Sequence, residues 1–357
     1  MKKKISKYKS LIDSLKQEIR QRTVGSRFYN QEEIMKKYKL SYSTVSHALQ
    51  ELVQERMLIR ITGQGTFIQS LTEQTGRPEK QKLPELVLSF SEPTPTRSTP
   101  WNWFIHAKIQ QGVCNSYPER CQICTHAKLE ELLRKDQVPC VIVINPLPPL
   151  EKLIEEKHIP YITIRQDLRR RKSNALEINH MPGMVEAVNY LVRDLEMKRI
   201  AMISTDKVSH ADRVTAFRIA LQGWKIELPK EYLYFDPIGA VEGGAAAMAH
   251  LLSLPEPPEA VIADTDLQAW GVLNELKRRK IAVPEKISVI GFDNLEGDAD
   301  TEPPLTSIDC SYVRAGEMAV EMLLELLESG EEKIPCRQLQ TKLVIRETCR
   351  DPLHDKK

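Results

Sequence analysis

One pattern of hydrophobic and polar positions runs through the first 68 residues of the chain. Apolar residues at helical spacing predict one helix over Tyr8–Ile19 and another over Val45–Val53. Asn30 followed by Glu33 has the form of a capping box, which predicts a short helix between them. "LIRITGQGTFI" then alternates as two strands around a glycine-containing turn. Three helices and a hairpin predict a winged helix-turn-helix at residues 1–69.

A different pattern begins at residue 85, where Val- and Ile-rich runs such as "CVIVIN", "AVIAD" and "ISVIGFD" alternate with amphipathic helices. Such runs predict an α/β fold with parallel sheets that helices cover on both faces. Residues 85–357 are too many for one sheet, so we expect a two-lobed domain with a cleft. Ligands in such sheets bind beyond the carboxyl ends of the strands. The polar, aperiodic segment 70–84 predicts a linker.

The charge of the chain is distributed unevenly. Residues 1–80 hold 16 Lys and Arg against 8 Asp and Glu, a net charge of +8, whereas the remainder holds 35 against 41, a net charge of −6. A basic head on an acidic body predicts a polyanionic partner for the head alone. The basic N-terminus lacks the apolar core of a signal peptide, and no apolar run approaches the roughly 18 residues of a membrane span. We therefore expect a cytoplasmic protein with its seven scattered cysteines reduced.

The polar face of the third predicted helix is the candidate DNA-binding surface. A DNA major groove about 12 Å wide admits one helix, whose amino-terminal residues face the base edges. Hydroxyls there can donate to phosphates, glycines let the hairpin tip approach the backbone, and basic side chains add salt-dependent affinity. The alternative is a surface helix in an unrelated bundle, with solvated hydroxyls. The candidate DNA-binding residues are Lys36, Ser41, Tyr42, Ser43, Thr44, Ser46, His47, Arg60, Gly63, Gln64 and Gly65.

The motif S-x-x-T-V-x-x-A-L-x-x-L runs from Ser41 to Leu52 and is followed by "GQGTF" in the predicted hairpin. With these motifs, the first 68 residues resemble the GntR-type winged-helix domain. The family usually places arginines at the positions of Glu32, Tyr42 and Ser46. The resemblance implies the fold and double-stranded operator DNA as a partner, and the missing arginines indicate either an atypical operator or weaker intrinsic binding.

"RVTAFRIAL", "AVIADTDLQAWG" and above all "ISVIGFDN" followed by "PPLTSI" give residues 86–346 a resemblance to LacI-type effector domains. These domains are similar to periplasmic sugar-binding proteins, in which two lobes close on a small molecule. A GntR-type head on a LacI-type body is the arrangement of the arabinose-repressor family of Gram-positive bacteria. The resemblance implies a homodimeric repressor that binds a pseudo-palindromic operator and responds to a sugar.

The same resemblance implies roles for individual residues. Arg213 stands where the family places an arginine on effector hydroxyls, and Asp293 matches a cleft carboxylate. Thr265 and Asp266 stand at the family's Asn-Asp pair, with Thr265 as a departure. Sugars also bind aromatic faces, for which the sequence offers several tryptophans. The candidate effector-binding residues are Trp103, Arg213, Thr265, Asp266, Trp270 and Asp293.

Each assignment has an alternative: Arg213 as a surface residue, Asp293 as a turn cap, and the tryptophans as core residues. Cys121 and Cys124 invite a metal site, but on a strand residues three apart point to opposite faces. We predict no metal, no cofactor and no catalytic residue, because no nucleophile or phosphate-binding motif occurs. Two other functions stay open: a carbohydrate-active enzyme with an accessory DNA-binding head, and a regulator without a small-molecule ligand.

Overall fold

The computed structural model describes residues 7–20, 22, 26–40, 44–45, 48–49, 52, 57–61, 65–68, 83–91, 99–117, 120–166, 172–205 and 211–350. The chain divides into two compact units, Met1–Lys82 and Leu83–Lys357. We call them the head and the body. None of the described helices is long and apolar enough to cross a lipid bilayer.

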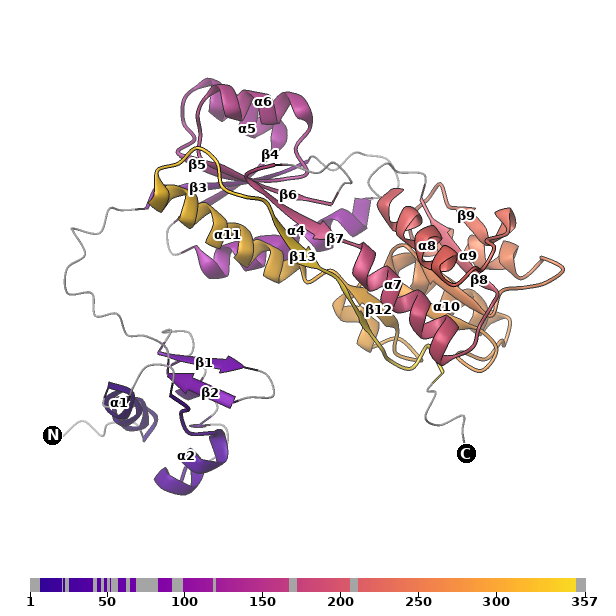
Figure 1. The fold of residues 1–357 in the computed structure, drawn as a ribbon, viewed down its shortest axis with the longest axis horizontal. Helices are drawn as coiled ribbons and strands as arrows, with labels where there is room; N and C mark the ends of the chain where they lie inside the picture. The colour runs from indigo at the N-terminus through magenta and orange to yellow at the C-terminus, as the bar shows by residue number, and fades with distance from the viewer. Residues whose placement is uncertain are drawn as a thin grey trace. The chain divides into compact units, whose positions relative to one another are not determined.

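The head contains the helices and hairpin that the sequence predicts. Helix α1 (Lys7–Arg20) and helix α2 (Gln31–Tyr38) precede a hairpin of β1 (Leu58–Ile61) and β2 (Gly65–Ile68), which pair antiparallel (Figure 1). The described positions of the third predicted helix are helical, and its apolar stripe is buried together with Leu11, Leu15 and Ile34. Asn30 and Glu33 form the expected capping box, in which each side chain accepts a hydrogen bond from the backbone N–H of the other residue.

The body begins with a parallel sheet. Its described strands run in the order β13-β7-β6-β5-β3-β4, with α4 and α11 on one face and α5 and α6 on the other (Figure 1). We call this sheet and its helices the first lobe. The strands are β3 (Leu86–Phe90), β4 (Cys121–Thr125), β5 (Cys140–Ile144), β6 (Tyr161–Arg165), β7 (Ala175–Asn179) and β13 (Arg337–Gln340). The helices are α4 (Thr99–Ser116), α5 (His126–Arg134), α6 (Pro148–Glu156) and α11 (Tyr312–Ser329).

The second lobe repeats this architecture. Its described strands run in the order β14-β12-β11-β10-β8-β9, and all pairs are parallel except β12 with β14. Helices α7 and α8 pack together, as do α9 and α10. The strands are β8 (Ile200–Ser204), β9 (Leu233–Phe235), β10 (Ala260–Ala263), β11 (Ser288–Asp293), β12 (Thr306–Asp309) and β14 (Lys342–Val344). The helices are α7 (Met181–Asn189), α8 (Ala211–Gly223), α9 (Val241–Leu251) and α10 (Asp266–Arg278).

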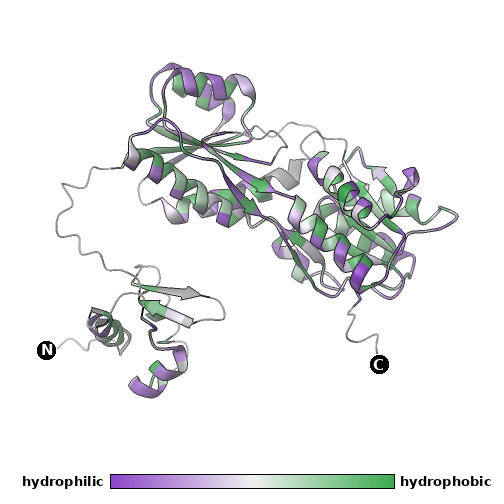
Figure 2. Cartoon of the chain, viewed as in Figure 1, coloured by the Kyte–Doolittle hydropathy of each residue, from purple (hydrophilic) through white to green (hydrophobic). Residues whose placement is uncertain are grey.

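The central strands are hydrophobic because helices cover both faces of each sheet. Every residue of β5, β8 and β10 is buried. Figure 2 shows hydrophobic residues along the strands and hydrophilic ones on the outer faces of the helices. Both lobes place the first strand between the second and the third, which creates a point where the direction of strand order reverses. The predicted α/β body with parallel sheets is confirmed.

Within the described residues, the chain passes between the two sheets three times. It does so from β7 to α7, from β12 to α11 and from β13 to β14. Thr341 ties two of these passages together, since its hydroxyl donates to the Asn179 carbonyl at 2.9 Å and accepts the Gly183 N–H at 3.0 Å. These segments form the hinge between the lobes.

Candidate effector site and DNA-binding surface

The carboxyl ends of the strands in both lobes carry polar side chains. In the second lobe, Thr205 follows β8, Asp264 follows β10 and Asp293 ends β11. In the first lobe, Asn145 follows β5 and Gln166 follows β6. This edge of a parallel sheet is where ligands bind in open α/β folds. We examine these residues as the candidate effector site.

Arg213 and Asp293 form a buried ion pair in the second lobe. The Arg213 guanidinium lies 3.0 Å from the Asp293 carboxylate, and the two residues are 1% and 2% exposed. The same guanidinium also donates to the Asp264 carbonyl and lies 3.9 Å from the centre of the Phe292 ring. Burial alone would lower the pKa of Arg213, but the Asp293 carboxylate raises it above its ordinary value. Arg213 is therefore a charged residue of the interior, and the surface alternative is excluded.

Tyr312 joins this pair from the other lobe. It is the first residue of α11, and its hydroxyl donates to the Asp293 carboxylate at 2.7 Å. Burial and the Asp293 charge raise the pKa of Tyr312 well above its ordinary value, so the hydroxyl keeps its proton and remains a donor. Our sequence reasoning did not select Tyr312. The available signal was its place directly after the "PPLTSI" strand, where the chain crosses the hinge.

His180 is a second residue that the sequence did not single out. It lies in the hinge before α7, where Nδ1 is 2.5 Å from the Asp212 carboxylate and the ring meets Phe292 edge-on. Burial and the Arg213 charge lower the pKa of His180, so the imidazole is neutral. A neutral ring that donates from Nδ1 to Asp212 leaves Nε2 as an acceptor. Nε2 has no hydrogen-bond partner in the described part of the chain.

The predicted residues Thr265, Asp266 and Trp270 all lie at the start of α10. Thr265 caps this helix by accepting the Gln268 N–H, and the Asp266 carboxylate accepts from the Ser307 hydroxyl at 2.6 Å. Asp266 also accepts the Leu295 N–H at 2.9 Å, and the Trp270 indole donates to Asp298 at 2.9 Å. These contacts join the end of β10 to the ends of β11 and β12. A role for the three residues in effector binding stays a prediction.

The remaining predicted aromatic residue, Trp103, lies in the first turns of α4, and its side chain is outside the described part of the structure. Polar groups of the first lobe were not among our predicted residues. The Asn145 and Gln166 side chains hydrogen-bond at 3.5 Å, and Asn145 also accepts the Gln166 N–H at 3.1 Å. Gln166 Nε2 and the Thr205 hydroxyl are buried without a partner among the described residues. Both atoms lie at the edges where an effector would bind.

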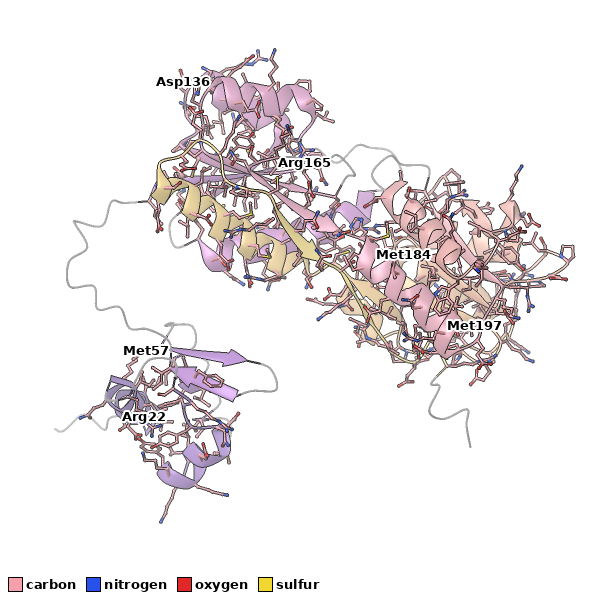
Figure 3. All side chains as sticks on the ribbon, viewed as in Figure 1. Arg22, Met57, Asp136, Arg165, Met184 and Met197 are labelled. Atoms are coloured by element: carbon pink, nitrogen blue, oxygen red, sulfur yellow. The ribbon has the colours of Figure 1, made fainter. Side chains whose placement is uncertain are left out.

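A second buried ion pair, Arg165 with Glu151 at 2.6 Å, lies behind this edge of the first lobe (Figure 3). It joins the end of β6 to the first turn of α6. Both side chains are almost fully buried, so removal of either partner alone would leave an uncompensated charge in the interior.

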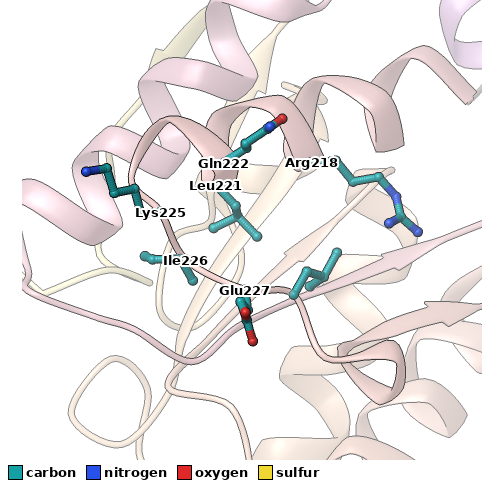
Figure 4. A pocket seen from close by; sticks show the side chains of 7 residues that line it. Arg218, Leu221, Gln222, Lys225, Ile226 and Glu227 are labelled. Carbon is teal, nitrogen blue, oxygen red and sulfur yellow. The ribbon is translucent and has the colours of Figure 1, made fainter.

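A surface hollow of about 540 Å³ lies elsewhere on the second lobe (Figure 4). Arg218, Gln222, Lys225 and Glu227 are among its lining residues, at and beyond the C-terminal end of α8. Arg213 lies near the N-terminal end of the same helix. The hollow is therefore separate from the candidate effector site.

The cysteine motif lies on a strand, as predicted. Cys121 and Cys124 are the first and fourth residues of β4, and they pack against different hydrophobic clusters on opposite faces of the sheet. Within the described residues, no group of three or more potential metal ligands converges.

Few of the predicted DNA-binding residues fall within the described structure. Lys36 is exposed in the last turn of α2, and Thr44 is half-buried in the third helix. The backbones of Arg60 and Gly65 lie in β1 and β2. Ser41, Tyr42, Ser43, Ser46, His47, Gly63 and Gln64 lie outside the described residues.

Lys37, the neighbour of Lys36, has a structural partner. Its ammonium lies 2.6 Å from the Glu18 carboxylate and donates to the Tyr29 hydroxyl at 3.0 Å, while Tyr38 donates to the same carboxylate. This cluster joins α1 to α2. Lys36 is exposed and does not belong to this cluster.

Comparisons with known proteins agree with both halves of this description. A family described as bacterial regulatory proteins of the gntR family matches residues 7–68, and a periplasmic binding protein-like domain matches residues 189–349. The chain joins a GntR-type head to a periplasmic-binding-protein-like domain. The effector domain carries Arg213, Asp293 and Tyr312, and the head carries the winged helix-turn-helix.

Curated relatives of this chain are transcriptional repressors. The HTH-type transcriptional repressor CytR of Escherichia coli (strain K12) is 27% identical over 330 residues, which span 88% of this chain and 94% of the relative. The repressor PurR of Mannheimia succiniciproducens is 33% identical over 175 residues, which span 48% of this chain and 51% of the relative. The protein is a DNA-binding transcriptional regulator.

Solved structures share the fold. A transcriptional regulator CelR–cellobiose complex superposes with a TM-score of 0.65 and 21% identity, over 87% of this chain and 92% of the other. A LacI family regulator from Enterococcus faecium with bound ribose gives a TM-score of 0.62 and 20% identity, over 74% of this chain and 98% of the other.

Proposed function

We propose that this regulator is a homodimeric, cytoplasmic repressor without enzymatic activity, and that a neutral sugar bound between the lobes controls its operator affinity. The observation that carries the proposal is the network of Arg213, Asp293 and Tyr312. It joins groups of both lobes at the carboxyl ends of the strands, where a ligand would be enclosed.

The chemistry of the network supports a polyhydroxylated ligand. Sugar hydroxyls both donate and accept, and charged partners make the strongest hydrogen bonds to them. Arg213 supplies donors, Asp293 supplies acceptors and Tyr312 supplies a donor from the opposite side of the cleft. His180 and Gln166 add an acceptor and a donor that have no partner among the described residues. Because Arg213 and Asp293 neutralise each other, the network favours a ligand without net charge.

Such a ligand can couple to DNA binding through the hinge. Its hydrogen bonds to both lobes would stabilise the closed arrangement, and closure changes how the two heads of a dimer are presented to the operator. The two heads of a dimer fit a pseudo-palindromic site whose half-sites are separated by a whole number of turns of the DNA helix. Coupling of this kind is typically about 1–3 kcal/mol. Sugar binding releases the operator if, in the closed arrangement, the separation of the two heads no longer matches the spacing of the half-sites.

DNA binding is tested with a labelled duplex that contains the region upstream of the protein's own gene. Fluorescence anisotropy should give an affinity that falls with salt, because each basic contact releases counterions. The variant Lys36→Ala should reduce the magnitude of the slope of log affinity against log salt by about 0.9 for each head, or about 1.8 for the dimer. Lys277→Ala, a change in the body, is the matched control and should leave the slope unchanged. A slope near zero for the wild-type chain would contradict DNA binding by the head.

Effector control is tested by thermal shift and by the same titration with cellobiose, ribose and L-arabinose. A sugar that stabilises the wild type should weaken duplex binding about 5- to 150-fold. Asp293→Asn should abolish both effects, whereas the exposed Asp300→Asn should preserve them. Salt-dependent DNA binding without any sugar response would favour a regulator that has lost its ligand. Turnover of a sugar by the wild type that Asp293→Asn abolishes would favour the enzyme.

A further inference from the structure

Two cysteines of the first lobe lie on the same side of its sheet near the amino-terminal ends of the strands. Cys121 on β4 and Cys140 on β5 both pair with Leu86 on β3, one from each side. Residues in register on parallel strands project from the same face. Leu86 and Cys140 belong to the core that also contains residues of α4 and α11, and Cys121 packs against that core. Cys121 therefore projects toward the helices from the outermost strand.

The helix next to Cys121 is α4. Helix α11 contacts β5, β6 and β7, so α4, which packs beside it, covers the side of β3 and β4. The contact between these helices is a backbone contact, because a Cβ at Gly112 would lie 2.0 Å from the Val313 carbonyl oxygen. After α4 ends, Tyr117 donates its hydroxyl to the Pro84 carbonyl at 2.7 Å. The last turn of α4 is thus held in place over the edge of the sheet.

Cys114 lies in that last turn and is exposed to solvent. It lies close enough to the Cys121 thiol for the two side chains to interact, and only residues 115–120 separate them along the chain. Burial, together with the contact to Cys114, raises the pKa of Cys121 to about 12. The pair therefore combines a thiol that is open to a soluble oxidant with a protonated thiol beside it.

The other cysteines nearby have different surroundings. Cys124 lies on the opposite face of β4, in the cluster with Leu129 and Val141. Cys140 is fully buried and donates to the Glu85 carbonyl at 3.7 Å. Cys114 is exposed to solvent, whereas Cys124 and Cys140 are buried.

We propose that Cys114 and Cys121 are a redox modification site that closes to an intramolecular disulfide when the protein meets a peroxide. The Cys114 thiolate attacks one peroxide oxygen, the O–O bond breaks, and the departing hydroxide takes a proton to become water. The Cys121 sulfur then attacks the resulting Cys114 sulfenic acid. The S–S bond forms, the S–O bond breaks, and the proton lost by Cys121 converts the leaving hydroxide to a second water. The two sulfurs lose two electrons and the peroxide gains them. This site goes beyond the regulatory function proposed above.

The test uses the reduced full-length chain, treated with hydrogen peroxide, denatured and titrated for free thiols. Two of the seven thiols should disappear, and dithiothreitol should restore both. Trypsin cleaves after Lys108, Arg120 and Lys128, so the product is the peptide 109–120 linked to the peptide 121–128. Its mass should be lower by two hydrogen atoms than the sum of the two peptides. Fragmentation within residues 121–128 then distinguishes Cys121 from Cys124.

Two cysteine variants test whether the disulfide depends on Cys114. Cys114→Ser replaces an exposed thiol, so it should fold normally and form no linked peptide, whereas Cys336→Ser should form it as the wild type does. A wild type that retains all seven thiols under peroxide would overturn the proposal. So would a cross-link between two chains, a link to Cys124, or thiol loss that is unchanged in Cys114→Ser.

Discussion

At the cleft, the Tyr312 hydroxyl donates to Asp293 at 2.7 Å, and the same carboxylate is the partner of Arg213 at 3.0 Å. Three buried polar groups, one each from α8, β11 and α11, are therefore joined in one hydrogen-bond network. Each of them would be costly to bury without the others. The network has to be considered as a unit when one member is changed.

Tyr312→Phe removes a hydroxyl but keeps the ring. Because the lost hydrogen bond has a charged acceptor, we expect the free energy of unfolding in urea to fall by about 2 kcal/mol. Tyr190→Phe is the matched control, since its hydroxyl donates to the Arg350 carbonyl at 2.7 Å outside the cleft, and should cost about 1 kcal/mol. Sugar affinity should change in Tyr312→Phe alone. An equal response of both variants in both measurements would exclude a role of Tyr312 in the site.

Asp298 should make the stability of the body depend on pH. Burial raises the pKa of Asp298 from 3.8 to about 6, and its neighbour Asp266 is raised as well. Between these pH values the folded state binds more protons than the unfolded state, so the free energy of unfolding falls as pH rises. This contribution is fully present below pH 3.8 and is lost once the pH exceeds about 6. Asp298→Asn should remove about 3 kcal/mol of this dependence, as measured by urea unfolding at a series of pH values.

The Trp270 indole, which donates to Asp298 at 2.9 Å, provides a local probe. Its fluorescence should titrate near pH 6 in the wild type and in the exposed control Asp300→Asn. The titration should disappear in Asp298→Asn. Persistence of the same midpoint in that variant would assign it to another group.

At the scale of elements, helices α4 and α11 pack with their backbones in contact. Gly112→Ala would bring a Cβ within 2.0 Å of a backbone oxygen of α11, which a side-chain rotation cannot relieve. We expect a loss of about 1–3 kcal/mol of unfolding free energy and a lower melting temperature. Gly223→Ala, at the end of α8, has nothing within 4 Å of the new Cβ and should be neutral or slightly stabilising. Equal melting temperatures for the two variants would contradict the backbone contact.

The elements that the sequence predicted best are those with local signals. Asn30 and Glu33 satisfy each other within one turn, and the runs at β5, β8 and β10 are buried on both faces, so neither signal depends on distant residues. β13 escaped prediction because it is polar, alternates between half-buried and exposed residues, and pairs with β7 from far along the chain. Short edge strands lack the hydrophobic run by which a central strand is recognised.

The candidate site was predictable only in part. The resemblance gave Arg213 and Asp293, but their mutual ion pair depends on where α8 meets β11, a contact 80 residues apart. Tyr312 and His180 are in the site because the hinge brings them there, and no local pattern marks such a residue. From the sequence alone, Asp266 looks like a ligand-binding carboxylate. In the structure this carboxylate accepts hydrogen bonds from the Ser307 hydroxyl and the Leu295 N–H.

At the scale of the whole body, an ion pair joins the lobes in addition to the hinge. Lys108 on α4 contacts Glu296, which follows β11, and the Glu296 side chain is 85% exposed. Exposed pairs are screened by salt, so this contact should weaken as ionic strength rises. Glu296→Gln should increase the radius of gyration of residues 83–357 in small-angle scattering at low salt, toward the high-salt value of the wild type.

Lys277 and Glu302 form an exposed pair within the second lobe, at 3.4 Å, so Glu302→Gln is the matched control. It should leave the radius of gyration unchanged. Identical scattering from both variants and the wild type at every salt concentration would show that the Lys108 contact does not restrain the lobes.

The three passages between the sheets have a consequence for synthesis of the protein. The first lobe acquires α11 and β13 only from residues 312–340, after every strand of the second lobe except β14 has been made. On the ribosome, the nascent head has all its elements by residue 68 and can fold early, whereas strands β5 to β7 emerge without the helix that covers them. Their apolar face is open to solvent until residues 312–329 have been translated. That interval is when a chaperone would be needed most.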